Sequence, residues 1–462
     1  MTPSSLPAVQ DAVRATRPED LVPYPDQAMF LALRGADQAA VMQALWFYDR
    51  PVDREGIARI HRNLYNGLFG RQIETSALPF GRHRWVSVQP TDSNLRFEET
   101  SRPRAELFDW ADEQVALPLD PEWGPAWRIG VQPFDDGTTV VSLVATHCIA
   151  DGAGAVMSIV EAVHGMRRDL GYAAPRSRRR SRAVREDLRQ LGRDFPEIRR
   201  TLVRFAKVAF NRRRDLARPA AAPAVTASGK AAAHVPSASI FIDIDQWDAR
   251  AEALGGNNFS LAAGFAGKLA QNLKRTRTSD GVVTLMIPVN DRGDFDDTGG
   301  NVVSIANVSF DPARVTADLT GPRNAIRDAL KKAREVPDEM VELLPLIPFV
   351  PKRGIAKMVD VAFGFTTDLP TSVSNLGDLP ADMMKVDGTP AKYLCFRGMD
   401  RQVSQDTLDR RGGILTVASG RVSGKVVISV MSYQPGQQNT QSGLRQVIAD
   451  TMGEFGLSGE IA

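Results

Sequence analysis

The sequence predicts a mixed α/β (α+β) protein made of two core units. At 462 residues the chain is longer than one ordinary hydrophobic core supports. Strand-patterned and helix-patterned runs alternate in both halves of the chain. Between the halves, residues 217–238 are rich in Ala and Pro, which is typical of an extended linker. We therefore expect a first subdomain at 1–175, a basic helical segment with the linker at 176–238, and a second subdomain at 239–462.

The first part carries both strand and helix patterns. Residues 40–49 (AVMQALWFYD) suit a strand, whereas residues 54–68 have apolar residues at helical spacing. Residues 126–134 and 138–146 flank an Asp-Asp-Gly sequence, which indicates a hairpin between two strands. A helix is expected over 153–168, where the apolar positions again recur at helical spacing.

The segment 176–218 is strongly basic. It carries 16 lysines and arginines against 5 acidic residues, so the remainder of a chain with a net charge of +2 is acidic. Its apolar residues recur at alternating spacings of three and four: Leu188, Leu191, Phe195, Ile198, Leu202, Phe205 and Ala209. Pro196 is expected to divide the segment into two helices, because proline lacks an amide hydrogen and clashes with the preceding turn. Two placements fit: on an anionic membrane or lipid-body surface, or with the apolar stripe packed on the protein's own acidic surface.

The second half resumes with a strand pattern over 237–245, and a helix is expected over 259–275. Further strands are expected at 282–288, 302–310, 371–376, 412–419 and 425–433. The chain should close with a helix over 443–455.

The composition argues against several classes of protein. A hydrophobic content of 43% and a charged content of 24% fit a soluble globular protein. No apolar run approaches the ~20 residues that a membrane-spanning helix needs, and the N-terminus lacks a secretory-signal pattern. Cys148 and Cys395 form neither a disulfide framework nor a zinc-site spacing. We expect a cytoplasmic protein with no nucleic-acid partner, because no binding motif accompanies the basic segment.

His147 is the main candidate for chemistry. It is one of five histidines, and it follows residues 140–146, an apolar and β-branched run typical of a buried strand. Asp151 and Gly152 come just before the expected helix, so His147 lies where a strand opens into a loop, a common place for functional side chains. A neutral imidazole, with a reference pKa of about 6.5, can accept a proton from a hydroxyl or an amine at pH 7. The pattern therefore predicts a general base.

A structural interpretation of these residues is also open. Asp151 alone would make an ordinary N-cap for the helix, and His147 would then be a hydrogen-bonded core histidine. The spacing H-x-x-x-D-G at a strand–loop–helix junction favours function, because it would seldom arise by chance among five histidines.

Other catalytic signatures are missing from the sequence. It has no G-x-S-x-G, no Walker P-loop and no H-x-x-x-H or H-E-x-x-H pair, so we expect no metal site. The remaining histidines have no recognisable partners and are expected to be ordinary surface or core residues: His61, His83, His164 and His234.

Together these residues resemble the acyltransferase superfamily whose signature is H-x-x-x-D-G. It includes chloramphenicol acetyltransferase, peptide-synthetase condensation domains and wax ester synthase/diacylglycerol acyltransferases. The resemblance is closest to the last group and runs over most of the chain. Its landmarks, in chain order, are YPDQAMFLAL, RQIETSALPFGRHRWV, LPLDPEWGPAWRIG, PVNDR, GGNVV and SVSNLGDLP.

The resemblance implies two chloramphenicol-acetyltransferase-like subdomains that form a V around a central substrate channel. His147 would be the general base within the channel, followed by Asp151 and Gly152 of the motif. Asp151 would point away from the substrate and pair with Arg292 of PVNDR, a task that suits the fixed geometry of a bidentate pair.

Four further residues are implied as lining the channel. Trp127 belongs to the segment that resembles a Pro-Leu-Trp motif, and Asn301 belongs to GGNVV. Ser374 and Asn375 belong to SVSNL, where closing a strand-end turn is an equal alternative.

Three positions depart from the family pattern. Thr146 stands where many members have a second histidine, Ala126 lies in the middle of the Pro-Leu-Trp motif, and Asn257-Asn258 replaces Asn-Asp. These departures leave the proposed chemistry in place. They bear on whether the substrate is a lipid.

The resulting expectation is an acyltransferase that moves an acyl group from acyl-CoA to the hydroxyl of a fatty alcohol or diacylglycerol. One alternative takes the acyl group from an acyl-carrier-protein thioester and gives it to an alcohol or amine of a specialised metabolite. Another is a non-catalytic homologue that binds lipid or a partner protein. No cofactor is expected besides the thioester substrate.

Overall fold

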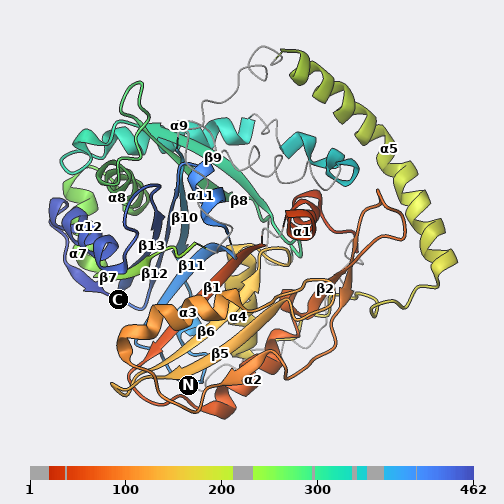
Figure 1. The fold of residues 1–462 in the computed structure, drawn as a ribbon, viewed down its shortest axis with the longest axis horizontal. Helices are drawn as coiled ribbons and strands as arrows, with labels where there is room; N and C mark the ends of the chain where they lie inside the picture. Colours follow the sequence, from red (N-terminus) through yellow and green to blue (C-terminus); the bar gives the residue numbers. More distant parts are fainter. Residues whose placement is uncertain are drawn as a thin grey trace, which may run out of the picture.

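The structure is a computed structural model, and it describes residues 20–36, 39–211, 233–293, 297–335, 341–350, 369–401 and 403–462. Most of the expected linker lies outside these residues. The described chain forms a five-stranded sheet, a seven-stranded sheet and a small two-stranded sheet. The two large sheets, with their helices, are the cores of two subdomains (Figure 1).

The first sheet has the strand order β11-β1-β6-β5-β4. Its strands are β1 (Ala39–Tyr48), β4 (Leu95–Phe97), β5 (Trp127–Pro133), β6 (Thr139–Thr146) and β11 (Tyr393–Arg401). The expected hairpin is confirmed, because β5 and β6 pair antiparallel, and β6 pairs with β1 on its other side. Every residue of β6 is buried, which explains why most of its side chains are apolar.

In the described part of the first subdomain, the helices are α1 (Tyr24–Ala36), α2 (Arg54–Leu64), α3 (Leu107–Ala116) and α4 (Gly152–His164), with the short turns η1 (Leu68–Gly70) and η2 (Arg104–Glu106). Helices α2 and α4 are the two expected from sequence, and α1 and α3 are additional. The small sheet pairs β2 (Arg71–Glu74) with β3 (Arg84–Ser87). Gln43 of β1 donates a hydrogen bond to the Ala111 carbonyl of α3 at 2.9 Å, which fixes α3 against the sheet.

The second sheet has the strand order β14-β7-β13-β12-β10-β8-β9. Its strands are β7 (Ser237–Asp243), β8 (Val283–Asn290), β9 (Val303–Phe310), β10 (Thr371–Asp378), β12 (Ile414–Val422), β13 (Lys425–Tyr433) and β14 (Gly459–Ile461). Its helical elements are α7 (Ile244–Ala253), α8 (Asn258–Asn272), η3 (Pro312–Arg314), α9 (Thr320–Glu335), α11 (Gln405–Arg410) and α12 (Gln441–Glu454). Phe265 of α8 and Phe455 after α12 are fully buried in this second core. The strands and helices expected in this half are therefore present.

One segment of the second half belongs to the first sheet. After β10 the chain passes through η5 (Ala381–Met384) and enters β11, which pairs antiparallel with β1 from Ala39 to Phe47. The Trp46 indole donates to the Met383 carbonyl at 2.7 Å and reinforces this crossing. Figure 1 shows blue β11 beside red β1. A boundary drawn at residue 239 does not separate the two subdomains in space.

The basic segment forms one helix, α5 (Arg180–Asn211), with Pro196 inside it. The predicted division into two helices at Pro196 is therefore wrong. Pro196 and Gly192, four residues earlier, are both exposed, and the space around Gly192 is open. Water can therefore solvate the Gly192 carbonyl that loses its helical donor, and contacts on both sides of the proline keep the helix continuous.

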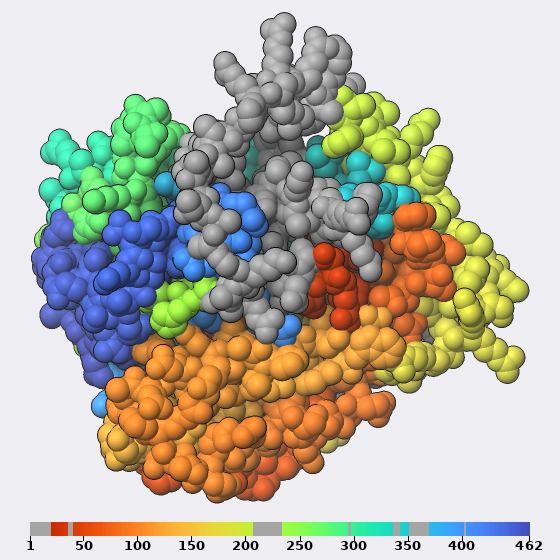
Figure 2. Space-filling view, in the orientation of Figure 1, coloured from red at the N-terminus to blue at the C-terminus, as the bar shows by residue number. Residues whose placement is uncertain are grey.

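Helix α5 runs along one edge of the molecule, as the yellow-green atoms in Figure 2 show. Ala183, Ile198 and Thr201 are buried, and α5 packs on η4 (Val341–Phe349), while Tyr24 and Pro25 of α1 line the adjoining cavity. In contrast, Leu188, Phe195 and Leu202 of the predicted apolar stripe are 54%, 61% and 52% exposed. Most of the stripe thus faces outward rather than toward the protein.

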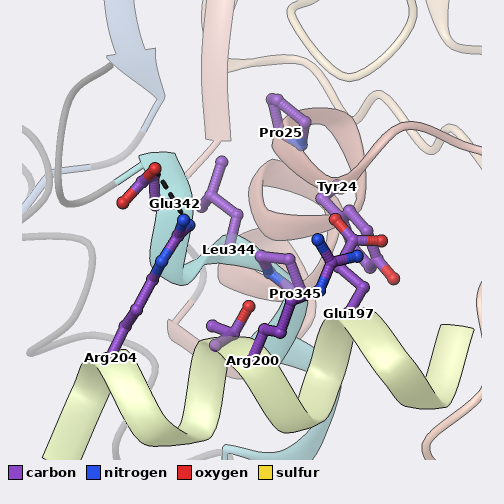
Figure 3. A pocket seen from close by; sticks show the side chains of 9 residues that line it. Tyr24, Pro25, Glu197, Arg200, Arg204, Glu342, Leu344 and Pro345 are labelled. Atoms are coloured by element: carbon purple, nitrogen blue, oxygen red, sulfur yellow. Dashed lines mark ion pairs between the residues drawn. The ribbon is translucent and has the colours of Figure 1, made fainter. Parts of the chain in front are cut away.

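Between α5, α1 and η4 lies a small cavity of about 270 Å³ (Figure 3). Arg204 of α5 pairs there with Glu342 of η4 at 2.9 Å.

Among the described residues, no helix is both long enough and apolar enough to span a bilayer.

Candidate active site

His147 follows directly on β6, at the point where the chain leaves the first sheet. Its backbone N–H donates to the Ala40 carbonyl at 2.9 Å, so pairing with β1 continues past the end of β6. His147 is partly exposed, whereas every other residue from Ala145 to Asp151 is buried. The imidazole is therefore the side chain that this turn offers to a substrate.

Asp151 uses its two carboxylate oxygens differently. Oδ1 accepts from the Gly154 N–H at 2.7 Å and caps the N-terminus of α4. Oδ2 accepts from Arg292 Nη2 at 2.8 Å and from the Val302 N–H at 2.9 Å. The helix cap and the pair with Arg292, which the sequence presented as alternatives, therefore occur together.

Arg292 bridges the two halves of the chain from a buried position, with its side chain 6% exposed. Only one of its nitrogens faces Asp151, so the bidentate geometry expected from sequence is not formed. The other terminal nitrogen donates to the carbonyls of Asp297 and Gly299 at 2.7 and 3.2 Å. In return, the Asp151 N–H donates to the Gly300 carbonyl at 3.0 Å. Residues 297–302 of the second half thus hold the motif loop.

Arg71 joins the same junction, and the sequence reasoning missed it. Its guanidinium is fully buried, lies 4.1 Å from the centre of the Trp85 ring, and donates to the Ile149 carbonyl at 2.6 Å. It also donates to the carbonyls of Thr298 and Gly299. A signal was available in the sequence, because Arg71 is the first residue of the landmark RQIETSALPFGRHRWV. No role was predicted for this arginine.

Asn301 contacts His147 directly. Its Oδ1 lies 3.1 Å from His147 Nδ1, and its Nδ2 donates to the His147 carbonyl at 2.7 Å. The same Nδ2 donates to the carboxylate of Asp26, whose Oδ1 also accepts the Asn301 N–H at 2.9 Å. Asn301 therefore lies beside the ring of His147, while Asp26, which no sequence pattern singled out, lies behind Asn301.

Burial determines the protonation state of the His147 imidazole. It lowers the pKa of His147, and the hydrogen bond that the ring donates to Asn301 Oδ1 and the charges of Asp151 and Asp400 recover only part of that shift. The imidazole is accordingly neutral at pH 7 and able to accept a proton. Burial also raises the pKa of Asp26 to about 6, against the hydrogen bonds from Asn301 and the charge of Arg71.

The segment around β10 approaches the motif through Leu376. A Cβ on Gly152 would lie 3.0 Å from Leu376 Cδ2, closer than ordinary carbon–carbon contact, so a glycine permits this approach. Asn375 Oδ1 accepts from the Gly377 N–H at 2.8 Å, the turn-closing arrangement that the sequence left open. Ser374 lies one residue earlier in β10 and is partly exposed.

Trp127 lines a different space. Its indole is buried and donates to the Phe69 carbonyl at 2.8 Å. It borders a cavity of about 390 Å³ whose walls come from residues 65–176, including Ala126. Trp127 is therefore placed in a cavity of the first subdomain and not among the side chains that contact His147.

The described residues contain no group of three or more His, Cys, Asp or Glu side chains placed to hold a metal ion.

No protein-family model matches the sequence, and no curated protein matches it. Solved structures do match. The wax ester synthase/diacylglycerol acyltransferase from Marinobacter aquaeolei VT8 is similar at a TM-score of 0.53 and 16% identity, over 95% of this chain and 100% of that one. The first condensation domain of the calcium-dependent antibiotic synthetase is similar at 0.57 and 14%, over 95% and 96%. The starter condensation domain of rhizomide synthetase gives 0.53 and 11%, over 95% and 94%.

At these identities the comparisons establish the fold, and they cover both subdomains. The chain has the fold common to a wax ester synthase/diacylglycerol acyltransferase and to condensation domains, which confirms the fold class predicted from sequence. Within that fold, His147 lies where residues of the second half meet the end of a strand of the first sheet.

Proposed function

We propose that this protein is an acyltransferase in which His147 is the general base, moving an acyl group from a thioester to a hydroxyl. The observation that carries the proposal is the setting of His147. A partly exposed, neutral imidazole ends a buried strand, and its Nδ1 is directed at the side-chain oxygen of Asn301. The remaining nitrogen, Nε2, is then the one available to a substrate. The similarity in fold to an acyltransferase and to condensation domains supports the same reaction class.

The proposed reaction needs no covalent enzyme intermediate. Nε2 of His147 takes the proton of the acceptor hydroxyl as its oxygen attacks the thioester carbonyl carbon. The tetrahedral intermediate collapses, the carbon–sulfur bond breaks, and the leaving thiolate takes the proton from His147. Holding both substrates beside one base makes their encounter an oriented, intramolecular one.

For the donor and acceptor we propose acyl-CoA and a hydrophobic alcohol, either a fatty alcohol or diacylglycerol. The similar wax ester synthase/diacylglycerol acyltransferase supports this choice. The alternative, a carrier-protein thioester with an alcohol or amine acceptor, is supported by the similar condensation domains and by the departures at Ala126 and Thr146.

The experiment is a donor and acceptor panel. Long-chain acyl-CoA and the same acyl group on an acyl-carrier protein are each offered with fatty alcohols, diacylglycerol and polar amines. Free thiol and the new ester or amide are measured together. We expect stoichiometric CoA and ester with a hydrophobic alcohol; preference for the carrier thioester selects the alternative. Tight lipid binding without turnover for any pair would favour a non-catalytic homologue and contradict the proposal.

We further propose a cytoplasmic protein that touches anionic membranes or lipid bodies peripherally. The support is α5, whose outward face combines exposed Leu188, Phe195 and Leu202 with exposed arginines at 185, 189 and 199.

A further inference from the structure

We propose that Asp26 is a positioning residue that acts through Asn301 to fix which ring nitrogen of His147 carries the proton. The inference rests on the proposed function for its catalytic consequence, whereas the tautomer itself can be measured without any substrate.

The orientation of the Asn301 amide is determined by its surroundings. Its Nδ2 group has two hydrogens and two acceptors, the Asp26 carboxylate and the His147 carbonyl. Turning the amide over would place its oxygen against both acceptors and its NH₂ group against the ring. Since a carboxylate only accepts hydrogen bonds, Asp26 holds the nitrogen on its own side and Oδ1 toward His147.

The orientation of Asn301 in turn selects the histidine tautomer. Oδ1 of Asn301 can only accept, and it lies 3.1 Å from His147 Nδ1. The hydrogen must therefore be on Nδ1, which leaves the lone pair on Nε2. Without Asp26 the amide could turn, the hydrogen could move to Nε2, and the base would lose the lone pair that the proposed reaction uses.

The chain is shaped to enclose Asp26. Its side chain is fully buried, and both its oxygens would lie 2.5 Å from a Cβ at position 300, where the chain has glycine. Oδ2 has no hydrogen-bond partner among the described residues. A buried carboxylate with one unsatisfied oxygen costs stability, so its placement calls for an explanation other than packing. The charged groups that act on it are Arg71 and Asp151.

The ionisation of buried Asp26 changes the stability of the folded protein in a definite direction as the pH rises. Burial raises the pKa of Asp26 from 3.8 to about 6, so its ionised form is disfavoured by folding. The resulting contribution to stability is present below pH 3.8 and is lost as the pH rises through about 6. At pH 7.5 the ionised Asp26 therefore destabilises the folded protein. An Asp26→Asn variant keeps the shape, removes that cost and removes the acceptor-only constraint.

The experiment compares the wild-type protein, Asp26→Asn and Asp387→Asn. Asp387 is a matched control, because it is also buried but pairs with Arg50 at 2.9 Å, far along the chain from the motif. Although burial acts to raise it, hydrogen bonds from Arg50, Thr389 and Asp53 hold the pKa of Asp387 below its usual value. Asp387→Asn should therefore lower the unfolding temperature at pH 7.5 and leave kcat unchanged.

For Asp26→Asn we expect the opposite pair of results. The unfolding temperature should be equal to or above that of the wild type, kcat should fall about 10- to 100-fold, and KM should change little. The wild-type kcat should decline as the pH falls through about 6, where Asp26 takes up a proton, and this step should be absent in the variant, which keeps only the decline caused by protonation of His147 itself.

The tautomer is read directly from ¹⁵N-histidine-labelled protein by long-range ¹H–¹⁵N NMR at pH 8, with His147→Gln assigning the signal. We expect Nδ1–H in the wild type and a larger Nε2–H population in Asp26→Asn. An unchanged tautomer in the variant overturns the inference, as does a loss of kcat that parallels a loss of stability. If no donor and acceptor pair turns over, the proposed function fails, and the NMR result alone still decides the role of Asp26.

Discussion

At the scale of single residues, Asp151 shows how one side chain joins local and long-range structure. One of its oxygens caps α4, whereas the other accepts from Arg292 and from the backbone of Val302. The helix cap is local, so it forms wherever α4 forms. The second oxygen depends on residues 141 and 151 positions away. The motif loop therefore takes its final shape only when the second half of the chain docks.

The Arg292→Gln variant should be strongly destabilised and nearly inactive. Removing one partner of a buried ion pair leaves the other charge uncompensated, which typically costs about 3–5 kcal/mol of unfolding free energy. Asp151 and Arg292 are 3% and 6% exposed, so water compensates little. The measurement is urea unfolding with ester formation assayed in parallel.

Arg62→Gln is the matched control, because Arg62 pairs with Glu55 at 2.7 Å while both side chains are exposed. We expect no measurable change in stability for this variant. Equal stability of Arg292→Gln and Arg62→Gln would show that the pair with Asp151 does not hold the loop.

The candidate site could be predicted from the sequence only where its residues lie in recognisable patterns. His147, Asp151 and Gly152 are contiguous, and Arg292 stands in PVNDR. Asp26 and Arg71 were missed because they act through contacts with residues 275 and 227 positions away. No local pattern marks a buried carboxylate or a buried guanidinium when its partners are amides and carbonyls contributed by distant segments.

At the scale of elements, α5 departs most from the sequence pattern. The 3-4-3-4 spacing of apolar residues was a sound indication of a helix, and the helix is present. The pattern does not reveal which neighbour covers the stripe. In the structure, α5 packs on η4, and the side chains that it buries are Ala183, Ile198 and Thr201. Leu188, Phe195 and Leu202 are left on the outer surface.

We expect α5 to bind anionic lipid surfaces. In vesicle sedimentation, the protein should bind phosphatidylcholine vesicles that contain phosphatidylserine more strongly than neutral ones, and added salt should weaken this binding. Replacing Leu188, Phe195 and Leu202 together by Ser should abolish it, because the apolar face then has nothing to insert. Phe259→Ser, which removes a side chain of similar exposure from α8, is the control and should bind normally. Undiminished binding by the triple variant would contradict a role for this face.

At the scale of the whole molecule, β11 is the feature that joins the two subdomains. It leaves the second half, pairs with β1 over nine residue positions from Ala39↔Arg401 to Phe47↔Tyr393, and returns to form β12. The sequence predicted the fold class and most strands because alternation and burial are local properties. Which sheet a strand joins is decided by partners far away, so the crossing could not be foreseen. The crossing holds the first sheet against the half that supplies Arg292 and Asn301.

The most direct test of the central claim is single-turnover ester formation by wild-type protein and His147→Ala, with the donor and acceptor pair that the panel identifies. Protein in excess over acyl thioester is mixed with acceptor, and both thiol release and ester are followed after unchanged folding is established by circular dichroism. If His147 is the general base, the transfer rate of His147→Ala should fall about 10²- to 10⁴-fold, the usual contribution of such a group. Transfer at the wild-type rate by His147→Ala would contradict that role.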